Sequence, residues 1–237
     1  MHNKKNKVLI PMAGLGSRFK KAGYSKAKPF IDINGDKLID IVLDNITPAD
    51  CEEVILVSLE RDNAKSENLK LKNKNAKLKI IEIDKPTDGT LRTILAAENE
   101  IKDCSLILAN CDQKINFNVD DFIEYCDDYD GGLITFTSQN PHHSYIETRR
   151  EIITNIIEKE VISDQAVSGV YYIKDANKFI EAAKIVTESN KKQKGEFYVS
   201  SALKLLINQG LKLLSYEAES IMLGTPEELT SYLRKNE

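Results

Sequence analysis

The cysteines of this chain are few and do not form pairs in the sequence. Four are present, Cys51, Cys104, Cys111 and Cys126, and no C-x-x-C motif occurs. This scattered spacing argues against a zinc ribbon and against a disulfide framework, because both need cysteines in a regular arrangement. We therefore expect free, buried thiols in a reducing compartment.

Long apolar runs are also absent. The first residues, MHNKKNK, are basic, but the apolar run that follows them stops at Pro11 and is too short for a signal peptide. No later run approaches the length that crosses a membrane. These observations predict a soluble, cytoplasmic protein without a membrane partner.

Neither sign of charge dominates. The 237 residues include 33 Lys and Arg against 37 Asp and Glu, a net charge of −4, and the two signs are balanced along the chain. A nucleic-acid footprint needs a basic face, so nucleic acid is not an expected partner. The 41% hydrophobic content is enough for a full core, and no linker, internal repeat or low-complexity stretch divides the chain. We predict one domain over residues 1–237.

The first half of the chain alternates strand and helix patterns. Apolar runs at 8–10, 54–59 and 78–83 predict buried strands, and residues 37–46 and 63–71 between them predict helices. This order indicates a parallel sheet covered by helices, in which ligands lie beyond the carboxyl ends of the strands. Further elements are expected as strands at 105–113, 133–137 and 211–216, and as helices after Gly89, at 117–129, at 175–186 and from Glu196 onward.

The residues after the first strand form an unusual loop. Segment 7–29 reads KVLIPMAGLGSRFKKAGYSKAKP, with Gly14 and Gly16 followed by Arg18 and Lys28. Glycine lets backbone N–H groups approach an anion, and the two side chains add full positive charges. The loop is therefore predicted to hold phosphate. The alternative, which the two glycines alone would favour, is a surface loop with solvated charges.

Two common phosphate-binding motifs do not fit this loop. The dinucleotide fingerprint G-x-G-x-x-G needs a third glycine where this chain has Phe19. A Walker loop needs Gly-Lys followed by Ser or Thr, which is missing. Because Phe19 replaces the third glycine of the dinucleotide fingerprint, an NAD-dependent oxidoreductase is disfavoured.

The pattern G-x-G-x-R-F followed by Lys28-Pro29 resembles the signature of the nucleotidyltransferases that activate sugar 1-phosphates and related phosphorylated metabolites. The resemblance covers almost the whole chain. It implies a three-layer, Rossmann-like α/β fold with a mostly parallel central sheet and a smaller acceptor-binding β subregion. It also implies that Arg18 meets the phosphates of the triphosphate and that Lys28 contacts the reacting phosphate. The nucleotide-binding residues that it implies in this loop are Met12, Ala13, Gly14, Gly16 and Ser17.

A second loop, DKPTDGT at 84–90, leads into the next predicted helix. Considered without any family, Thr87 or Asp88 could simply cap that helix. The segment resembles the family's second nucleotide loop, and this resemblance implies that Gly89 and Thr90 lie next to the base.

The apolar strand SLILANCDQ, at 105–113, ends in polar residues. A carboxylate at the end of a central strand, in a site that must hold a triphosphate, suits Mg²⁺ binding through oxygen. A turn or cap aspartate is the alternative. The family's strand-end aspartate matches Asp112, which the resemblance makes a catalytic residue and the Mg²⁺ ligand. Asn110 and Gln113 are expected to orient Asp112 or to touch the acceptor.

From Pro141 to Lys174 the pattern changes to strands separated by short polar turns. His142-His143 could suggest a metal site, but neighbours on an extended chain point to opposite faces and no third ligand lies nearby. A pair of loop residues is the better interpretation.

The run from Ile156 to Tyr172 resembles the acceptor subsite of the same family. The resemblance implies that Lys159 binds the acceptor phosphate and that Gly169 lies against the acceptor. Glu160 stands where the family usually has proline, which affects the turn. Glu196, predicted to open a helix, is expected to hold acceptor hydroxyls.

The closing segment MLGTPEELTSYL resembles the family's terminal stretch, in which Gly-Thr-Pro-Glu starts the last helix. Relatives that bind a sugar 1-phosphate often carry a second metal aspartate two residues before that glycine, where this chain has Met222. Either Glu217 or Glu219 is expected to substitute, or the metal relies on Asp112 and phosphates.

The reaction that the resemblance implies is attack of an acceptor phosphate oxygen on the α-phosphorus of a nucleoside triphosphate, with pyrophosphate leaving. Residues 1–138 are expected to bind the nucleotide and residues 139–237 the acceptor. A pyrimidine nucleotide (CTP, UTP or dTTP) and a phosphorylated sugar or small metabolite are favoured, in capsule or cell-surface polysaccharide biosynthesis. Two alternatives stay open: a cytidylyltransferase for a non-sugar phosphate acceptor and an inactive nucleotide-binding regulator. A homodimer is also left open.

Overall fold

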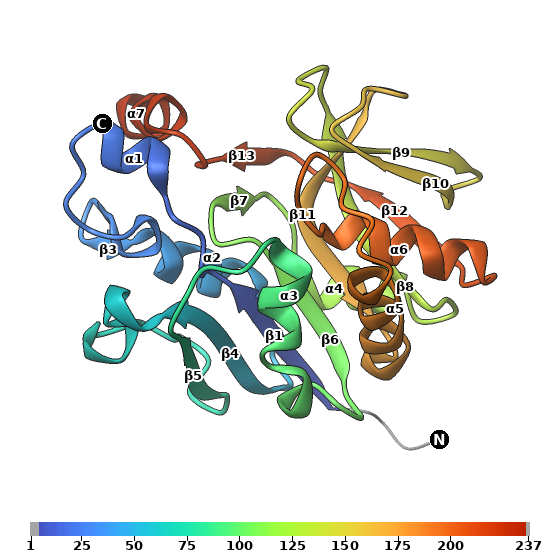
Figure 1. Cartoon of the computed structure of the whole chain (residues 1–237), viewed down its shortest axis with the longest axis horizontal. Coiled ribbons are helices and arrows are strands. Elements are labelled where there is room, and N and C mark those ends of the chain that lie inside the picture. The colour runs from blue at the N-terminus through green and yellow to red at the C-terminus, as the bar shows by residue number, and fades with distance from the viewer. Residues whose placement is uncertain (1–4, 236–237) are drawn as a thin grey trace.

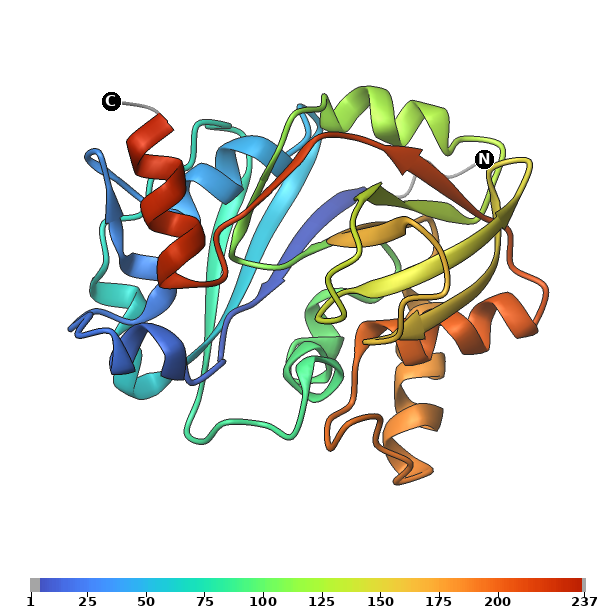
Figure 2. The same cartoon turned by 90° about the horizontal axis from the view of Figure 1, so that it is seen from above.

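A nine-stranded sheet forms the centre of the protein (Figures 1 and 2). The structure is a computed structural model that describes residues 5–235. The strands of the sheet lie in the order β5-β4-β1-β6-β11-β8-β12-β10-β9, and two short two-stranded sheets, β13-β7 and β2-β3, accompany it. The strands are β1 Asn6–Pro11, β2 Asp32–Ile33, β3 Asp36–Lys37, β4 Cys51–Leu59, β5 Lys77–Ile83, β6 Ser105–Ala109, β7 Gln113–Ile115, β8 Gly131–Thr137, β9 Ser144–Arg149, β10 Ile152–Glu158, β11 Gln165–Ile173, β12 Leu213–Glu217 and β13 Ser220–Met222.

Helices cover both faces of this sheet, which confirms the predicted three-layer α/β fold. One apolar cluster joins α3, α5 and α6 to one face, and a second joins α2 and α4 to the other. Figure 2 shows these two sets on opposite sides of the strands. The helices are α1 Ser17–Lys21, α2 Leu38–Ile46, α3 Thr90–Leu95, α4 Val119–Tyr125, α5 Ala176–Glu188, α6 Val199–Asn208 and α7 Pro226–Lys235.

Strand direction divides the sheet. The strands β5, β4, β1 and β6 are parallel neighbours, as the strand and helix alternation predicts. The strand β11 then runs antiparallel to β6 and to β8, while β8 and β12 are parallel. Beyond β12, β10 and β9 are antiparallel, as expected for strands joined by short turns. The second half of the chain therefore extends the first half's sheet through the β6–β11 pairing.

The apolar run of β1 explains why this strand lies in the middle. Val8, Leu9 and Ile10 have no exposed surface, and β1 pairs with β4 on one side and β6 on the other. Burying each such side chain contributes about 1.5–3 kcal/mol. Successive residues serve opposite faces, because Leu9 belongs to the α3, α5 and α6 cluster whereas Val8 and Ile10 belong to the α2 and α4 cluster.

The predicted helix at 63–71 is wrong. The chain forms two single 3₁₀ turns, η2 Glu60–Asp62 and η3 Ala64–Ser66, and then runs without regular structure until β5. Asn63, between the turns, has φ of +50°, which ends helical geometry. The segment also has few apolar side chains to bury, and a helix of this length needs tertiary packing to be stable.

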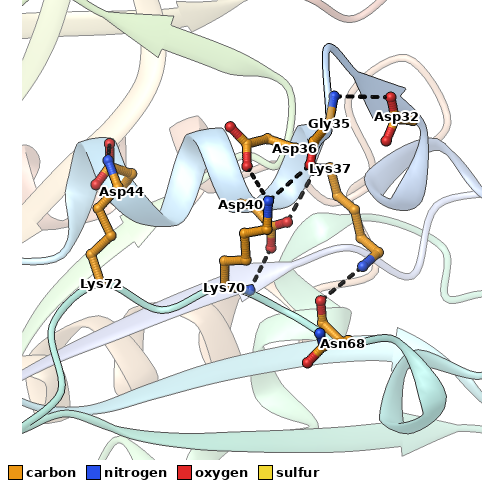
Figure 3. Close-up of polar contacts among 9 residues, drawn as sticks. All are labelled: Asp32, Gly35, Asp36, Lys37, Asp40, Asp44, Asn68, Lys70 and Lys72. Atoms are coloured by element: carbon orange, nitrogen blue, oxygen red, sulfur yellow. Dashed lines mark hydrogen bonds and ion pairs between the residues drawn. The ribbon is translucent and has the colours of Figure 1, made fainter.

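Asp40 of α2 holds this segment in place (Figure 3). Its carboxylate accepts the backbone N–H of Lys70 at 2.8 Å and that of Lys37 at 3.1 Å, and its side chain is buried. Lys37 Nζ donates to the carbonyl of Asn68 at 2.8 Å. Polar contacts therefore replace the apolar packing that a helix would have required.

Two other predicted boundaries shift. The strand predicted at 105–113 ends at Ala109, because the N–H of Asn110 bonds to the carbonyl of Gly169 and the chain then leaves the sheet to form β7. The helix expected to open at Glu196 begins at Val199 instead. Lys194 and Gly195 both have positive φ, so the chain turns there and Glu196 pairs with Gln193 in an isolated bridge.

The C-terminal helix α7 lies beside α1, at the glycine-loop end of the molecule (Figure 1). Leu223 and Leu229 pack with Phe19 of α1 and with Ile31 and Leu38 in a third apolar cluster. The end of the chain is thereby brought to the glycine loop near its beginning. Within residues 5–235, no helix has both the length and the apolar character needed to cross a bilayer.

Candidate active site

The glycine loop faces a cavity of about 490 Å³ that segments from both halves of the chain line. It lies where the loops follow β1 and β6, the position that the parallel strands predict. Gln113, Lys159 and Gly169 are predicted site residues that do not line it. The predicted residues that do are Met12, Ala13, Gly14, Gly16, Ser17, Arg18, Lys28, Gly89, Thr90, Asn110, Asp112 and Glu196.

A larger cavity, of about 600 Å³, lies between α2, the 114–120 segment and α7. Its residues Lys70 and Lys72 form ion pairs with Asp36 and Asp44 (Figure 3). Much of its positive charge is thus neutralised, and no glycine loop borders it. The cavity at the glycine loop is therefore better suited to a polyphosphate.

Gly16 provides the turn of the glycine loop. Its φ is +59°, in the left-handed region, and it is the N-cap residue of α1. A Cβ added to Gly16 would lie 3.5 Å from Cβ of Lys28, so the loop backbone packs closely against that residue. A Cβ on Gly14 would meet no atom within 4 Å, so an anion can approach the backbone there.

Lys28 and Asp112 form an ion pair in the wall of the cavity. Lys28 starts the 3₁₀ turn η1, Lys28–Phe30, and Asp112 follows β6. Burial by itself lowers the pKa of Lys28, but the Asp112 carboxylate more than compensates, so the pKa is raised above its usual value. Arg18 acts on Lys28 in the opposite sense, because it is a second cation nearby. The ammonium group therefore stays charged at neutral pH.

Cys111 lines the same cavity between Asn110 and Asp112. Burial raises the pKa of its thiol to about 11, so the thiol stays protonated near neutral pH and is a poor nucleophile. All four cysteines are free, as expected, and Cys111 is the one that is only half-buried.

The start of α7 adds a second carboxylate near Asp112 that the sequence did not reveal. The N–H of Leu223 donates to the carbonyl of Asp112 at 2.8 Å, which places Gly224 beside the Asp112 side chain. A Cβ added to Gly224 would lie 2.9 Å from Asp112 Oδ2 and 3.6 Å from Glu228 Oε2. An oxygen of each carboxylate therefore lies next to the position that a Gly224 side chain would take, and Asp112 and Gly224, but not Glu228, line the cavity itself.

Glu217 and Glu219, the expected substitutes for a second metal ligand, lie elsewhere. Glu217 accepts a hydrogen bond from Thr137 Oγ1 at 3.4 Å, and Glu219 accepts one from Asn116 Nδ2 at 3.5 Å. Neither lines the cavity that contains Asp112. Across residues 5–235, no group of three or more His, Cys, Asp or Glu side chains is arranged to hold a metal ion.

Gly169 makes room for Asn110. Gly169 has φ of +91°, and a Cβ there would lie 2.2 Å from Asn110 Nδ2. Gln113 is fully buried and donates its Nε2 to the carbonyl of Asn110 at 2.9 Å. Gly169 and Gln113 therefore contact Asn110 from outside the cavity, and Asn110 is the member of this group that lines it.

Lys159 lies beside the cavity and contacts Tyr198. It follows β10 with φ of +53°, and its N–H donates to the carbonyl of His143 at 3.0 Å. Its Nζ hydrogen bonds to the Tyr198 hydroxyl and lies 4.4 Å from the ring centroid. Burial, and after it the nearby Glu196 carboxylate, raise the pKa of Tyr198. Tyr198 therefore lies between Lys159 and Glu196.

The second loop packs against Phe197. Gly89 has φ of +140°, and a Cβ there would lie 2.3 Å from the backbone nitrogen of Phe197. The backbone carbonyl of Asp88 accepts a hydrogen bond from the N–H of Phe197 at 3.0 Å. The Asp88 carboxylate forms ion pairs with Arg92 Nε at 2.7 Å and with Lys192 Nζ at 2.8 Å. Gly89 is the N-cap residue of α3, and no side chain caps this helix, so the capping alternative for Thr87 and Asp88 is wrong.

His143 also lies near the carboxylates of the site, which the sequence did not indicate. Its ring packs edge-on against Phe136, with 5.2 Å between ring centroids. Burial lowers the pKa of His143, and the nearby charges of Glu228, Asp112 and Glu158 partly oppose that shift. His142 is the exposed neighbour, and its N–H donates to Asn140 Oδ1 at 3.1 Å.

Comparison with known proteins shows the class to which this arrangement belongs. The sequence model of one family, described as nucleotidyl transferase, matches residues 7–231. The chain therefore belongs to the nucleotidyl transferase family. The resemblance read from the glycine loop and Lys28-Pro29 is thereby confirmed.

Particular relatives share the fold and part of the sequence. The chain is 29% identical to the bifunctional protein GlmU of Thermodesulfovibrio yellowstonii over 248 residues, which cover 96% of this chain and 51% of that protein. It thus spans about half the length of the relatives that it matches.

Two solved structures have the same fold. A nucleoside-diphosphate-sugar pyrophosphorylase from Vibrio cholerae superposes with a TM-score of 0.77 at 23% identity, over 96% of this chain and 99% of that one. A UDP-glucose pyrophosphorylase in complex with UDP-glucose gives a TM-score of 0.81 at 16% identity, with 98% of each chain covered. At these identities the likeness establishes the fold.

Proposed function

We propose that the protein transfers a nucleotidyl group from a nucleoside triphosphate to a phosphorylated sugar or a similar small metabolite, with release of pyrophosphate. One observation carries the proposal: the glycine loop, Arg18 and the Lys28–Asp112 ion pair border a single cavity at the end of the parallel strands. The family match and the sugar-nucleotide enzymes among the similar structures support this substrate class.

The proposed reaction is an in-line displacement at phosphorus. A phosphate oxygen of the acceptor forms a bond to the α-phosphorus, and the bond from that phosphorus to the bridging oxygen breaks, so pyrophosphate leaves with the electron pair. No protein nucleophile takes part. Arg18 and Lys28 neutralise charge on the two anions and hold them in line, which is the main source of catalysis in such transfers.

The residues at Asp112 fit a divalent cation. Asp112 offers a carboxylate oxygen, the kind of ligand that Mg²⁺ prefers. This oxygen already binds one cation, the Lys28 ammonium, and Gly224 leaves space beside it. We assign Mg²⁺ to this position, where it would neutralise phosphate charge when bound. Phosphate oxygens would complete its coordination.

The acceptor is assigned to the side of the cavity formed by residues 139–237, and the nucleotide to the side formed by residues 1–138. Lys159, next to Tyr198, is assigned to the acceptor phosphate, and Asn110 and Glu196 are assigned to contacts with the acceptor. Gln113 and Gly169 are assigned to the acceptor site through Asn110, whose position they support. Gly89 and Thr90, which belong to the second loop and line the cavity, are assigned to the base on the sequence resemblance. A pyrimidine base and a role in capsule or cell-surface polysaccharide synthesis rest on the sequence resemblance.

One observation favours a second candidate. Met222 stands at the place of the second metal aspartate of sugar 1-phosphate enzymes, and in the structure it pairs with Gln113 across β13 and β7. This departure is compatible with a cytidylyltransferase that uses a non-sugar phosphate, or with a nucleotide-binding regulator.

Pyrophosphate release tests these assignments. The protein would be incubated with Mg²⁺ and each of CTP, UTP, dTTP, ATP and GTP, against a panel of sugar phosphates and small phosphorylated alcohols. Release that requires one base and one acceptor supports the proposed function. Tight nucleotide binding without release for any pair would favour the regulator.

A further inference from the structure

We propose that Glu228 is the second carboxylate of the divalent-cation site and holds the ion together with Asp112. The inference rests on the proposed function, since that function supplies the reason for a cation at Asp112. It concerns a residue of α7 that lies far from Asp112 in the sequence.

The main chain brings the two carboxylates together. The strand β13 pairs with β7, and the hydrogen bond from Leu223 N–H to the Asp112 carbonyl extends that pairing by one residue. The turn at Gly224 and Thr225 then starts α7 directly beside the Asp112 side chain. The position of Glu228 relative to Asp112 is therefore fixed by backbone contacts.

A capping box fixes the Glu228 side chain as well. Its Oε2 accepts the N–H of Thr225 at 2.9 Å, and its own N–H donates to Thr225 Oγ1 at 3.2 Å. Helix capping alone would explain this pair. Capping does not explain why the Glu228 carboxylate lies near Asp112. It also does not explain why a glycine, Gly224, lies between the two acidic groups.

The space between the carboxylates has the chemistry of a cation site. A Cβ on Gly224 would lie 2.9 Å from Asp112 Oδ2 and 3.6 Å from Glu228 Oε2, so even a methyl group would fill this gap. Within residues 5–235, no Lys or Arg forms an ion pair with Glu228, and half-buried like charges that face each other repel unless a cation lies nearby. Lys28 supplies that charge to Asp112 in this structure.

Magnesium prefers oxygen ligands at about 2.0–2.1 Å and usually keeps some of its waters. One metal-bound water spans the distance from the gap to the Glu228 oxygens, so the capping hydrogen bond to Thr225 is kept. Glu228 thus contributes the negative charge that neither Met222, which has no oxygen in its side chain, nor Glu217 and Glu219, which lie elsewhere, can contribute.

Binding of Mn²⁺, measured by the loss of the free-ion signal in electron paramagnetic resonance, tests the proposal without turnover. We compare Glu228→Gln with Glu227→Gln, which removes the same charge from the same helical turn at an exposed position. Glutamine retains the capping hydrogen bond, so both variants should fold equally well by thermal melting. We expect Glu228→Gln to weaken Mn²⁺ binding at least about tenfold, the effect of losing a supporting ligand, and Glu227→Gln to change it less than twofold.

Two further variants make the result specific. Asp112→Asn should abolish the binding, and Gly224→Ala should weaken it, because its Cβ occupies the gap while its φ lies outside the left-handed region. Equal Mn²⁺ affinity in Glu228→Gln and Glu227→Gln overturns the proposal, as does a wild-type protein that binds no Mn²⁺ even with inorganic pyrophosphate present. A protein that binds Mn²⁺ through Glu228 but releases no pyrophosphate from any substrate pair would contradict the proposed function and leave this inference in place.

Discussion

Two contacts connect Asn110 and Gly169: a backbone hydrogen bond, and the close packing of the Asn110 side chain against the glycine. The N–H of Asn110 donates to the Gly169 carbonyl at 2.9 Å. Asn110 Nδ2 also occupies the space that a side chain at position 169 would need. Gly169 has a left-handed φ of +91°, and in this conformation a Cβ would point toward the Asn110 amide. The orientation of an amide that lines the cavity thus depends on a glycine outside it.

Gly169→Ala is therefore expected to act in two ways. The positive φ costs alanine about 1–2 kcal/mol, and the contact of 2.2 Å with Asn110 Nδ2 forces that side chain to move. We expect the free energy of unfolding in urea to fall by about 2 kcal/mol and the acceptor KM to rise.

Gly23 provides the matched control. Its φ is +89°, nearly the same, but a Cβ there would meet no atom within 4 Å. Gly23→Ala should therefore show the backbone cost alone and leave the acceptor KM unchanged. Adding Asn110→Ala to Gly169→Ala should recover part of the lost stability, and no recovery would contradict the steric explanation.

Lys28→Ala and Asp112→Asn should each lower the rate of pyrophosphate release by about 100-fold or more. Lys28→Ala removes a positive charge assigned to the reacting phosphate, and Asp112→Asn removes the carboxylate that pairs with Lys28 and is assigned to Mg²⁺. The fold should survive, because the side chain of Asp112 is 19% exposed and can be hydrated after Lys28 is removed. Steady-state kinetics and thermal melting would be measured together.

Lys20→Ala and His142→Ala are the controls for that experiment. Lys20 is an exposed lysine of α1 that does not line the cavity, and His142 is an exposed loop residue. Both variants should retain wild-type rates. Near-normal turnover in both Lys28→Ala and Asp112→Asn would refute the charge-based mechanism.

Asp40→Ala should destabilise the protein by about 2 kcal/mol or more, because it leaves two backbone N–H groups, those of Lys37 and Lys70, without their acceptor. Urea unfolding would measure the loss, and hydrogen exchange should rise in residues 67–76. The control is Asp44→Ala, which removes an exposed carboxylate from the same helix as Asp40. Asp44 pairs with Lys72, and the loss of this pair should cost no more than about 1 kcal/mol. Equal losses in the two variants would contradict the role assigned to Asp40.

Features with a local cause could be predicted from the sequence. The buried run Val8–Ile10 and the break at Pro11 and Gly14 specify a strand and a loop through neighbouring residues, and the structure has both. The helix predicted at 63–71 failed because this polar, lysine-rich segment between two strands does not provide an apolar face. Its actual course depends on Asp40, a residue of another element.

The parts of the site that sequence reasoning missed depend on contacts between distant segments. Glu228 lies near Asp112 because β13 pairs with β7, and nothing near either residue in the sequence signals that pairing. Tyr198 contacts Lys159 after α6 packs against β10, which again joins separate segments. The GTPEE sequence does contain the capping box Thr225–Glu228, and this was a local signal for the position of the glutamate.

Lys159→Met tests the assignment of the acceptor phosphate. Methionine retains most of the apolar stem but removes the charge, and a lost hydrogen bond to a charged group costs about 1.5–3 kcal/mol. We expect the acceptor KM to rise by about 10- to 100-fold while the nucleotide KM stays unchanged. Tyr198→Phe should produce a smaller rise, because it removes only the hydroxyl that contacts Lys159 Nζ.

Lys174→Met serves as the comparison for that variant. Lys174 follows β11 and forms an ion pair with Asp127 at 3.6 Å, away from the cavity. Losing its exposed charge should leave both KM values unchanged. If Lys159→Met raises the nucleotide KM as much as the acceptor KM, the lysine serves both substrates, and the division of the cavity into nucleotide and acceptor sides has to be abandoned.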